Sequence, residues 1–381
     1  MSKMNSQPEL RTNASIYANP FPKFGRPEII GYIGLENLKY ARKISNTTVN
    51  FDLNLLAEEA QRKPPEHDVK LNDLIRFLYD NEKRLNFRTP NNLDSATIFC
   101  YRGLMTCVAN SPYENEPWMI VALLFKGNIY LCARDTQVKK LKKKNMTEKD
   151  KLFTSWGFKF EQYILSDKPH VKPNPNVPNN EMEEFSCVFR TTLNNHKIIY
   201  GAEMDGIRCD KKEVHEAPQT VDDVLHYLQD KEFIEVKTNR HLEFPHQHKS
   251  YRRYKTRKWW CQSFLVGIDT IICGFRNDNG IVEKLQTINV KDLPKISKEF
   301  WDPNVCFNFL DTFFVYVKRC FNREIKCKYG GKDFDLKSVP LTSLLFELVP
   351  NKYVKCMNYA HEDDPILPDW FLTTFGKHQE I

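Results

Sequence analysis

Apolar residues recur along the chain with two different periods. Residues 68–85 and 152–165 place apolar side chains three and four positions apart, which predicts amphipathic helices. The apolar stripe of the second segment contains Phe153, Trp156, Phe160 and Ile164. Glu161 lies beside this stripe, and we therefore expect its carboxylate to point towards the protein interior.

Other segments have the composition and alternation of strands. Residues 95–109 and 118–134 are rich in apolar residues, and the second contains the turn sequence KGN. SCVFRTTL, HKIIYGAEMDGI and FIEVKTN are further predicted strands. The sequence TIICGFRNDNGIVEKLQTI predicts a hairpin with NDNG at its turn.

Helices and loops are interleaved with these strands. We expect helices over 220–228, 251–267 and 301–321, and loops over 166–184 and 208–219. No stretch has the composition of a linker. The pattern predicts one α/β (α+β) domain over residues 21–381, preceded by a disordered tail over residues 1–20.

Composition narrows the class of protein. Of 381 residues, 41% are hydrophobic, enough for a large core, and the net charge of +7 suits a polyanionic partner. The first residues, MSKMNSQPEL, lack the apolar core of a signal peptide, and the 11 cysteines form no CxxC pair. The strongly apolar run WMIVALLF is too short to cross a bilayer. We expect an intracellular protein with reduced cysteines and no membrane partner.

Two further clusters have ordinary interpretations. The lysine-rich run 138–151 predicts a solvated helix face or loop, with a phosphate-attracting rim as the alternative. His241, His246 and His248 crowd one loop, but without further ligands they do not predict a zinc site.

The informative charges lie in two predicted strands. Glu203 and Asp205 are two residues apart in GAEMDG, and Glu235 and Lys237 are two apart in FIEVKTN. Residues two apart in a strand share a face, so each pair points to one side. Together with Glu161, these side chains predict a single cluster. An ion pair between Glu235 and Lys237 alone would leave the other carboxylates unexplained.

Converging carboxylates repel one another, and a hard divalent cation such as Mg²⁺ or Mn²⁺ resolves the repulsion. An acid followed by (D/E)xK is the pattern of PD-(D/E)XK nucleases. A lone ExK motif is a weak signal, because most such motifs lie on solvated strand faces; the ExD motif beside it strengthens the interpretation.

Two more polar residues stand in apolar surroundings. Gln262 lies four residues after Lys258 on a predicted helix and could hold a water or a phosphate, or could simply be a surface residue beside core tryptophans. Arg102 interrupts the apolar run FCYRGL, which we expect to be a strand. A buried arginine needs an anionic partner, either a protein carboxylate or an RNA phosphate.

These segments together resemble a known family. YRGLM, WGFKFEQY, AEMDG, FIEVKT, RKWWCQSFLVG and GFRNDNG occur in this order, with FPKFGRPEIIGYI, WDPNVCFNFL and PILPDWF around them. The set closely resembles the DXO-type decapping exoribonucleases, which include animal DXO and the fungal Rat-one-interacting proteins. The resemblance implies one domain with two central mixed or antiparallel β-sheets flanked by helices and a PD-(D/E)XK-nuclease-like core.

The resemblance also implies roles for individual residues. It implies two Mg²⁺ or Mn²⁺ ions held by Glu161, Glu203, Asp205, Glu235 and the main-chain carbonyl of Val236. Catalytic roles fall on Glu203, Asp205, Glu235, Lys237 and Gln262. Substrate binding falls on Tyr101, Arg102 and Gly103, together with Glu203, Lys237 and Gln262. Ala202 replaces a glycine of the family pattern, and the segment between Asp205 and Glu235 is longer than expected.

The activity implied is decapping of RNA 5′ ends with an unmethylated cap, a triphosphate or an NAD cap, followed by 5′-to-3′ degradation of 5′-monophosphate RNA. The alternatives are a catalytically inactive scaffold of the same fold that binds RNA ends, and a DNA exonuclease of the wider superfamily. Fungal members bind a nuclear exoribonuclease, but no surface for it is evident in this sequence. We expect a monomer, and the nucleus rather than the cytoplasm.

Overall fold

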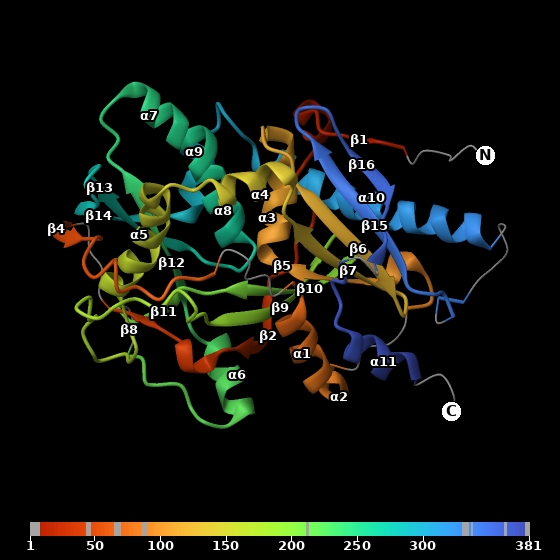
Figure 1. The fold of residues 1–381 in the computed structure, drawn as a ribbon, viewed down its shortest axis with the longest axis horizontal. Coiled ribbons are helices and arrows are strands. Elements are labelled where there is room, and N and C mark those ends of the chain that lie inside the picture. Colours follow the sequence, from red (N-terminus) through yellow and green to blue (C-terminus); the bar gives the residue numbers. More distant parts are fainter. Residues whose placement is uncertain are drawn as a thin grey trace.

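The computed structural model describes residues 8–42, 47–64, 70–85, 90–210, 213–329, 335–336, 338–361 and 364–377. Two mixed β-sheets lie side by side and are flanked by helices (Figure 1). The nine-stranded sheet has the order β1 (Leu10–Arg11), β16 (Tyr353–Asn358), β15 (Thr342–Val349), β6 (Met119–Phe125), β7 (Asn128–Arg134), β5 (Thr97–Tyr101), β10 (His196–Glu203), β9 (Ser186–Leu193) and β2 (Glu28–Ile33).

The seven-stranded sheet has the order β4 (Thr47–Asp52), β14 (Ile281–Asn289), β13 (Thr270–Arg276), β12 (Phe233–Arg240), β11 (Gly206–Arg208), β3 (Tyr40–Ala41) and β8 (Leu165–Ser166). Most strand pairs are antiparallel, but β5 runs parallel to β7 and β10, β12 runs parallel to β13, and β11 runs parallel to β3. The α/β class with two mixed sheets is thus confirmed.

Helices cover both faces of the sheets. They are α1 (Asn72–Asp80), α2 (Glu82–Leu85), α3 (Arg102–Asn110), α4 (Gln137–Lys144), α5 (Glu148–Ile164), α6 (Val221–Gln229), α7 (Pro245–Ser250), α8 (Thr256–Phe264), α9 (Leu293–Ile296), α10 (Pro303–Lys328) and α11 (Asp369–Lys377). Helices α3, α8 and α10 share one apolar core with the nine-stranded sheet, and α1 and α11 pack on its other face. No helix in the described ranges is long and apolar enough to cross a membrane.

The two sheets are joined by one short connection. Strand β10 ends at Glu203, and after Met204 and Asp205 the chain enters β11 of the other sheet. Strand β11 pairs with β12 only as far as Ile234, so the same edge of β12 is open beyond that residue. This junction is where the acidic residues of the two sheets meet.

Helix α5 forms as predicted, with one exception in its apolar stripe. A capping box between Thr147 and Asp150 begins the helix, and Trp156, Phe160 and Ile164 are buried against the seven-stranded sheet. Phe153 is instead 39% exposed, because the face that packs on the sheet runs through Leu152, Trp156, Phe160 and Ile164, and Phe153 lies beside it. Its ring packs on the outer side of Trp156, with 4.6 Å between centroids.

The strand predicted over 95–109 is wrong in its second half. The strand ends at Tyr101, and Arg102 begins α3. The buried residues Leu104, Met105 and Val108 follow helical spacing and pack with α8 and α10. A continuous apolar run gave no clue to this change, since a buried helix and a buried strand are equally apolar.

The disordered tail predicted over residues 1–20 is also wrong from residue 8 onward, and residues 1–7 lie outside the described ranges. Strand β1 pairs with β16, and the ring of Tyr17 meets that of Phe309 at 5.0 Å. Asn308 donates its side-chain amide to the carbonyl oxygen of Tyr17 at 3.1 Å. These contacts give a polar segment enough buried partners to fix it.

The contact between α5 and β13 predicts a stability change. A Cβ atom at Gly274 would lie 2.5 Å from the ring of Phe160, which is fully buried. We expect Gly274→Ala to lower the free energy of unfolding by about 1–3 kcal/mol through overpacking. Gly157 lies in α5 with nothing within 4 Å of a built Cβ, so Gly157→Ala should instead raise stability by about 0.5–1 kcal/mol. Urea unfolding measures both, and equal effects of the two variants would contradict this packing.

Candidate active site

Glu235 is the most deeply buried acid of the predicted cluster. It lies on β12 with no exposed surface, and two cations neutralise it: Lys237 Nζ at 2.5 Å and Arg102 Nη1 at 3.4 Å. Burial would raise the pKa of Glu235, but Lys237 and Arg102 together hold it below its usual value. The partner of buried Arg102 is therefore a protein carboxylate, and the bond ties the start of α3 to β12.

Lys237 is charged in this arrangement. Burial alone would lower the pKa of its ammonium group, but the carboxylates of Glu235 and Asp205 raise it overall. Glu235 and Lys237 share a face of β12, as their spacing predicts, and Cys273 lies opposite Lys237 on β13. Glu235 and Lys237 of the ExK motif thus form an ion pair on one face of β12.

Asp205 lies at the open edge of β12. Its Oδ2 accepts a hydrogen bond of 2.6 Å from the main-chain N–H of Val236. The N–H and C=O groups of one strand residue point to the same edge, so the carbonyl of Val236 also faces the gap that Asp205 occupies. The side chain of Val236 is buried against the apolar face that α5 covers.

Glu161 approaches this edge from the last turn of α5, and its side chain is half-buried. Burial raises its pKa well above the usual value, and the charges of Asp205 and Glu203 raise it further. Burial and the Glu235 carboxylate likewise raise the pKa of Asp205 to about 7. Both carboxylates have thus lost solvent and feel other carboxylates nearby, and the charge of Lys237 offsets this only in part.

Glu203 differs from its prediction. It ends β10 with an exposed side chain, whereas Asp205 lies in the connection rather than on the same strand. The two do not share a strand face, because the chain leaves the nine-stranded sheet between them. Desolvation and the Glu184 carboxylate raise the pKa of Glu203, and the charge of Glu235 raises it further. Glu203 therefore lies at the rim of the same site.

The three residues of the YRG stretch diverge. The ring of Tyr101 packs against Gly201 and belongs to the apolar cluster under α1, on the face of the sheet away from α3. Arg102 points to Glu235, and Gly103 is exposed in the first turn of α3. The structure brings Arg102 to the carboxylates and leaves Tyr101 as a packing residue.

Gln262 lies half-buried on α8, and within the described part of the chain its amide has no hydrogen-bond partner. Trp259 and Trp260 on the same helix are core residues. Lys258, one turn earlier, forms an ion pair of 3.2 Å with Glu114. The side-chain amide of Gln262 is thus available to bind a ligand, whereas Lys258 is already paired.

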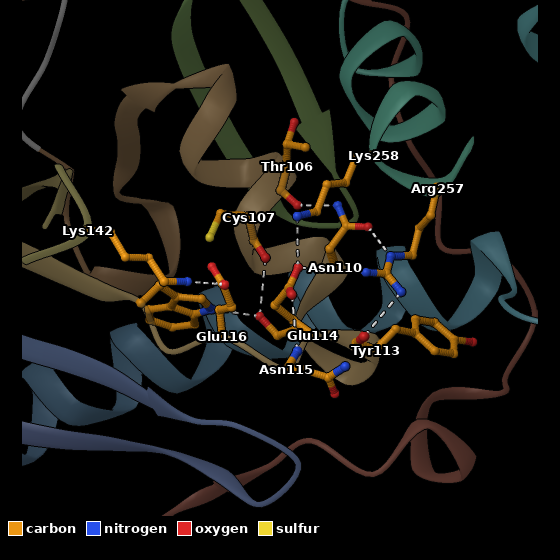
Figure 2. A network of polar contacts seen from close by, with 12 residues as sticks. Thr106, Cys107, Asn110, Tyr113, Glu114, Asn115, Glu116, Lys142, Arg257 and Lys258 are labelled. Atoms are coloured by element: carbon orange, nitrogen blue, oxygen red, sulfur yellow. Dashed lines mark hydrogen bonds and ion pairs between the residues drawn. The ribbon is translucent and has the colours of Figure 1, made fainter. Parts of the chain in front are cut away.

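A buried network that the sequence did not reveal fixes α8 against α3 (Figure 2). Arg257, 1% exposed, donates to Asn110 Oδ1 at 2.5 Å and to the carbonyl oxygen of Tyr113 at 3.3 Å. Glu114 lies 3.7 Å from the same guanidinium. Arg102 and Gln262 belong to these two helices, so the network fixes the distance between them. The sequence carries one signal for this network. Arg257 lies three residues before the core residue Trp260, so it falls on the buried face of the helix.

The lysine-rich run and the histidines take their ordinary interpretations. Helix α4 has no buried residue; Lys139 and Lys143 pair with Asp135, and Lys142 pairs with Glu116. His241 contacts Glu283 at 2.8 Å, while His246 and His248 are exposed.

Within the described ranges, no three Cys, His, Asp or Glu side chains stand close enough to form a ready-made metal site. The acids are neighbours nonetheless, since their charges shift one another's pKa values. Carboxylate and carbonyl oxygens are the donors that Mg²⁺ and Mn²⁺ prefer. The oxygen donors and the excess of carboxylates therefore fit a hard divalent cation.

Comparison with known proteins agrees with this architecture. The family model described as RAI1 like PD-(D/E)XK nuclease matches residues 32–372. The Drosophila melanogaster protein named Decapping and exoribonuclease protein Rai1 is 32% identical over 321 residues, which are 80% of this chain and 83% of that protein.

Two solved structures share the fold. Candida albicans Rai1 in complex with pU5 and Mn²⁺ superposes with a TM-score of 0.74 at 19% identity, covering 97% of this chain and 98% of that one. Scheffersomyces stipitis Rai1 in complex with 3′-NADP⁺ and a calcium ion gives 0.72 at 19% identity, covering 93% and 97%. The chain belongs to the RAI1-like PD-(D/E)XK nuclease family, whose named relatives are decapping and exoribonuclease proteins.

Proposed function

We propose that this protein is a metal-dependent nuclease that removes incomplete or unusual caps from RNA 5′ ends and then degrades the 5′-monophosphate RNA in the 5′-to-3′ direction. The observation that carries the proposal is the pair of carboxylates with raised pKa values, Glu161 and Asp205, beside the buried Glu235–Lys237–Arg102 cluster. Family membership supports a nuclease that hydrolyses RNA.

Glu161, Asp205, Glu235 and the Val236 carbonyl would hold the divalent cation, with Glu203 at its rim. A cation bound there supplies positive charge for the phosphate and lowers the pKa of a bound water. Asp205 and Glu161 must lose their protons to receive it, whereas Glu235 is already ionised because Lys237 and Arg102 stabilise its charge. We infer two ions, Mg²⁺ or Mn²⁺, from the family pattern.

The remaining polar groups bind and orient the substrate. The Lys237 ammonium carries three donors and is held charged, so it can bind a phosphate oxygen while keeping one bond to Glu235. The unpaired Gln262 amide can orient a water or a second phosphate oxygen. Arg102 retains donors beyond the one directed at Glu235.

The finer assignments extend this proposal. Crystal structures of Rai1 proteins with this fold hold pU5, 3′-NADP⁺ and 3′-FADP, which supports RNA and dinucleotide ends as ligands here. We propose unmethylated caps, 5′-triphosphates and NAD caps as substrates. A monomeric state and a nuclear location stay predictions from the sequence, as does the single domain over residues 21–381.

The second candidate is an inactive scaffold of the same fold that binds RNA ends. It would need the basic surface but not the acids. Carboxyl pKa values raised by burial and by neighbouring carboxylates, as at Glu161 and Asp205, are typical of functional sites, and this favours the enzyme.

Removing the Glu235 carboxylate should abolish hydrolysis and spare RNA binding. Glu235→Ala would leave two buried cations unpaired, at a cost of about 3–5 kcal/mol in stability, so Glu235→Gln is the cleaner variant. We expect kcat to fall by about two orders of magnitude or more, because one metal ligand is lost. Turnover of a 5′-phosphorylated RNA measures this, with the exposed Glu36→Gln as the control. Unchanged turnover in Glu235→Gln would overturn the assignment.

Metal binding should release protons and weaken at low pH. The folded pKa of Asp205 is about 7, above its ordinary 3.8, so below pH 7 the cation must displace a proton. We expect Mg²⁺ affinity to fall at least about tenfold per pH unit below 7, since the Asp205 proton alone gives that factor and a Glu161 proton adds to it. Calorimetry at pH 6 and 8 in two buffers of different ionisation enthalpy counts the protons released on binding. An affinity independent of pH would contradict the account.

The substrate class can be tested on one panel. We expect products from RNAs bearing an unmethylated cap, a 5′-triphosphate, an NAD cap or a 5′-monophosphate, and none from a 5′-phosphorylated DNA of the same sequence. Resolving the released products, with a methylated cap for comparison, decides the matter. Equal degradation of the DNA would favour a DNA exonuclease, and binding without any product would favour the scaffold.

A further inference from the structure

The segment that links β12 to α8 carries a concentrated positive charge. Residues 244–258 contain no acidic residue. Five of their cations are exposed, of which Lys258 pairs with Glu114. The other four are Lys249 at the end of α7 and Arg252, Arg253 and Lys255 in the turn that follows. In the described part of the chain, none of the four has a carboxylate within ion-pairing distance. Their charge is therefore available to a ligand.

The lysines of α4 make the contrast. That helix has five lysines, but three of them, Lys139, Lys142 and Lys143, form ion pairs with Asp135 and Glu116, which leaves Lys140 and Lys144. The segment before α8 differs from α4 in the larger number of exposed cations that lack such a partner.

Buried groups hold the basic turn in an unusual conformation. Residues 251–255 form a π-turn, in which the N–H of Thr256 bonds to the carbonyl of Tyr251. The carbonyl of Arg252 accepts bonds from Trp301 Nε1 at 3.1 Å and from Thr256 Oγ1 at 2.7 Å, and Ser297 Oγ lies 2.9 Å from that hydroxyl. Thr256 and Ser297 have no exposed surface. Single π-turns are frequent at functional sites, and this one fixes where two arginines leave the surface.

Aromatic side chains stand among these cations. Phe244 is 54% exposed and stacks on His246, with ring centroids 5.8 Å apart and planes within 7°. The guanidinium of Arg253 lies 5.5 Å from the ring of Tyr254. Exposed rings beside unpaired cations are the elements of a surface that binds single-stranded nucleic acid, where rings stack on bases and cations contact phosphates.

This surface continues to the candidate active site. Lys255, Lys258 and Gln262 are three and four residues apart, so they follow one face of α8. Cys273, which lies opposite Lys237 on the neighbouring strand, feels the charges of both Lys255 and Lys237. Figure 1 shows α7 and α8 following one another outward from the centre of the molecule. From Gln262 back to Lys249 the helical path is about 20 Å long.

We propose that Phe244, His246, Lys249, Arg252, Arg253 and Lys255 form a basic track that binds the single-stranded RNA leading away from the active site. The inference rests on the proposed function, and names where the substrate beyond its reacting end is held. The cations contact successive phosphates and the Phe244–His246 stack receives a base. The protein then prefers RNAs long enough to reach α7.

The test compares two variants of equal charge. The track variant carries Arg252→Gln, Arg253→Gln and Lys255→Gln; the control carries Lys140→Gln, Lys144→Gln and Lys149→Gln, three exposed lysines of α4 and the start of α5. Fluorescence anisotropy with a 5′-phosphorylated 20-nucleotide RNA, in EDTA and over a KCl series, gives the affinity and its salt dependence. The slope of log K against log[KCl] is negative, and we expect its magnitude to decrease by about 2 in the track variant, because three phosphate contacts are lost. In the control the slope should change little.

Phe244→Ala tests the aromatic part. It should weaken binding about fivefold or more without changing the salt slope, because it removes stacking and no charge. Equal losses in both charge variants, or an unchanged slope in the track variant, would overturn the track.

Hydrolysis separates this inference from the proposed function. With Mg²⁺ present, kcat/KM is compared for the 20-nucleotide RNA and a 5′-phosphorylated dinucleotide. In the track variant the ratio of the first to the second should decrease, because only the longer RNA reaches the track. No hydrolysis of either RNA by the unaltered protein would refute the nuclease assignment, while the anisotropy result would still decide the track. A preserved ratio together with active hydrolysis would refute the track alone.

Discussion

The site depends on one constraint, which is that Glu235 has no contact with solvent and must be neutralised from within the protein. Lys237 comes from the same strand and Arg102 from the start of α3, so the electrostatic need of one carboxylate joins two sheets and a helix. Arg257 then holds α3 against α8 through Asn110. The side chains that would bind a phosphate thus belong to a frame fixed by buried polar contacts.

The junction between the two sheets carries an excess of negative charge. Four carboxylates, Glu161, Glu203, Asp205 and Glu235, share the junction with only two cations, Lys237 and Arg102. Protons correct the imbalance when no cation is bound, which is why the pKa values of Glu161 and Asp205 rise. One divalent cation has the charge that would replace them. The open edge of β12, left uncovered because β11 is so short, supplies a carbonyl as a further ligand.

Much of this site could be predicted from the sequence. The ExK spacing places Glu235 and Lys237 on one face of a strand, and the stripe of α5 places Glu161 near the interior, because period alone decides both. The orientation of Tyr101 was inaccessible, since the helix that begins at Arg102 turns the two neighbours to opposite faces of the sheet. Asp205 leaves the strand of Glu203 because the chain changes sheets there, which local sequence does not encode.

Long-range polar contacts were the other limit. The role of Arg257 depends on Asn110 and Tyr113, more than 140 positions away. The π-turn depends on Trp301 and Ser297, which no periodicity of residues 251–255 reveals. The sequence showed that this segment is basic and aromatic, but only the tertiary partners show that its arginines are fixed and unpaired.

The central claim is that the carboxylates at the sheet junction exist to hold a divalent cation, and anomalous diffraction tests it most directly. Crystals of the protein grown with Mn²⁺ should show an anomalous peak bounded by Glu161, Asp205, Glu235 and the carbonyl of Val236. A peak at that place in the unaltered protein, lost in Asp205→Asn, is the result predicted. A junction without a peak, in crystals whose Mn²⁺ concentration is far above that needed for activity, would contradict the account.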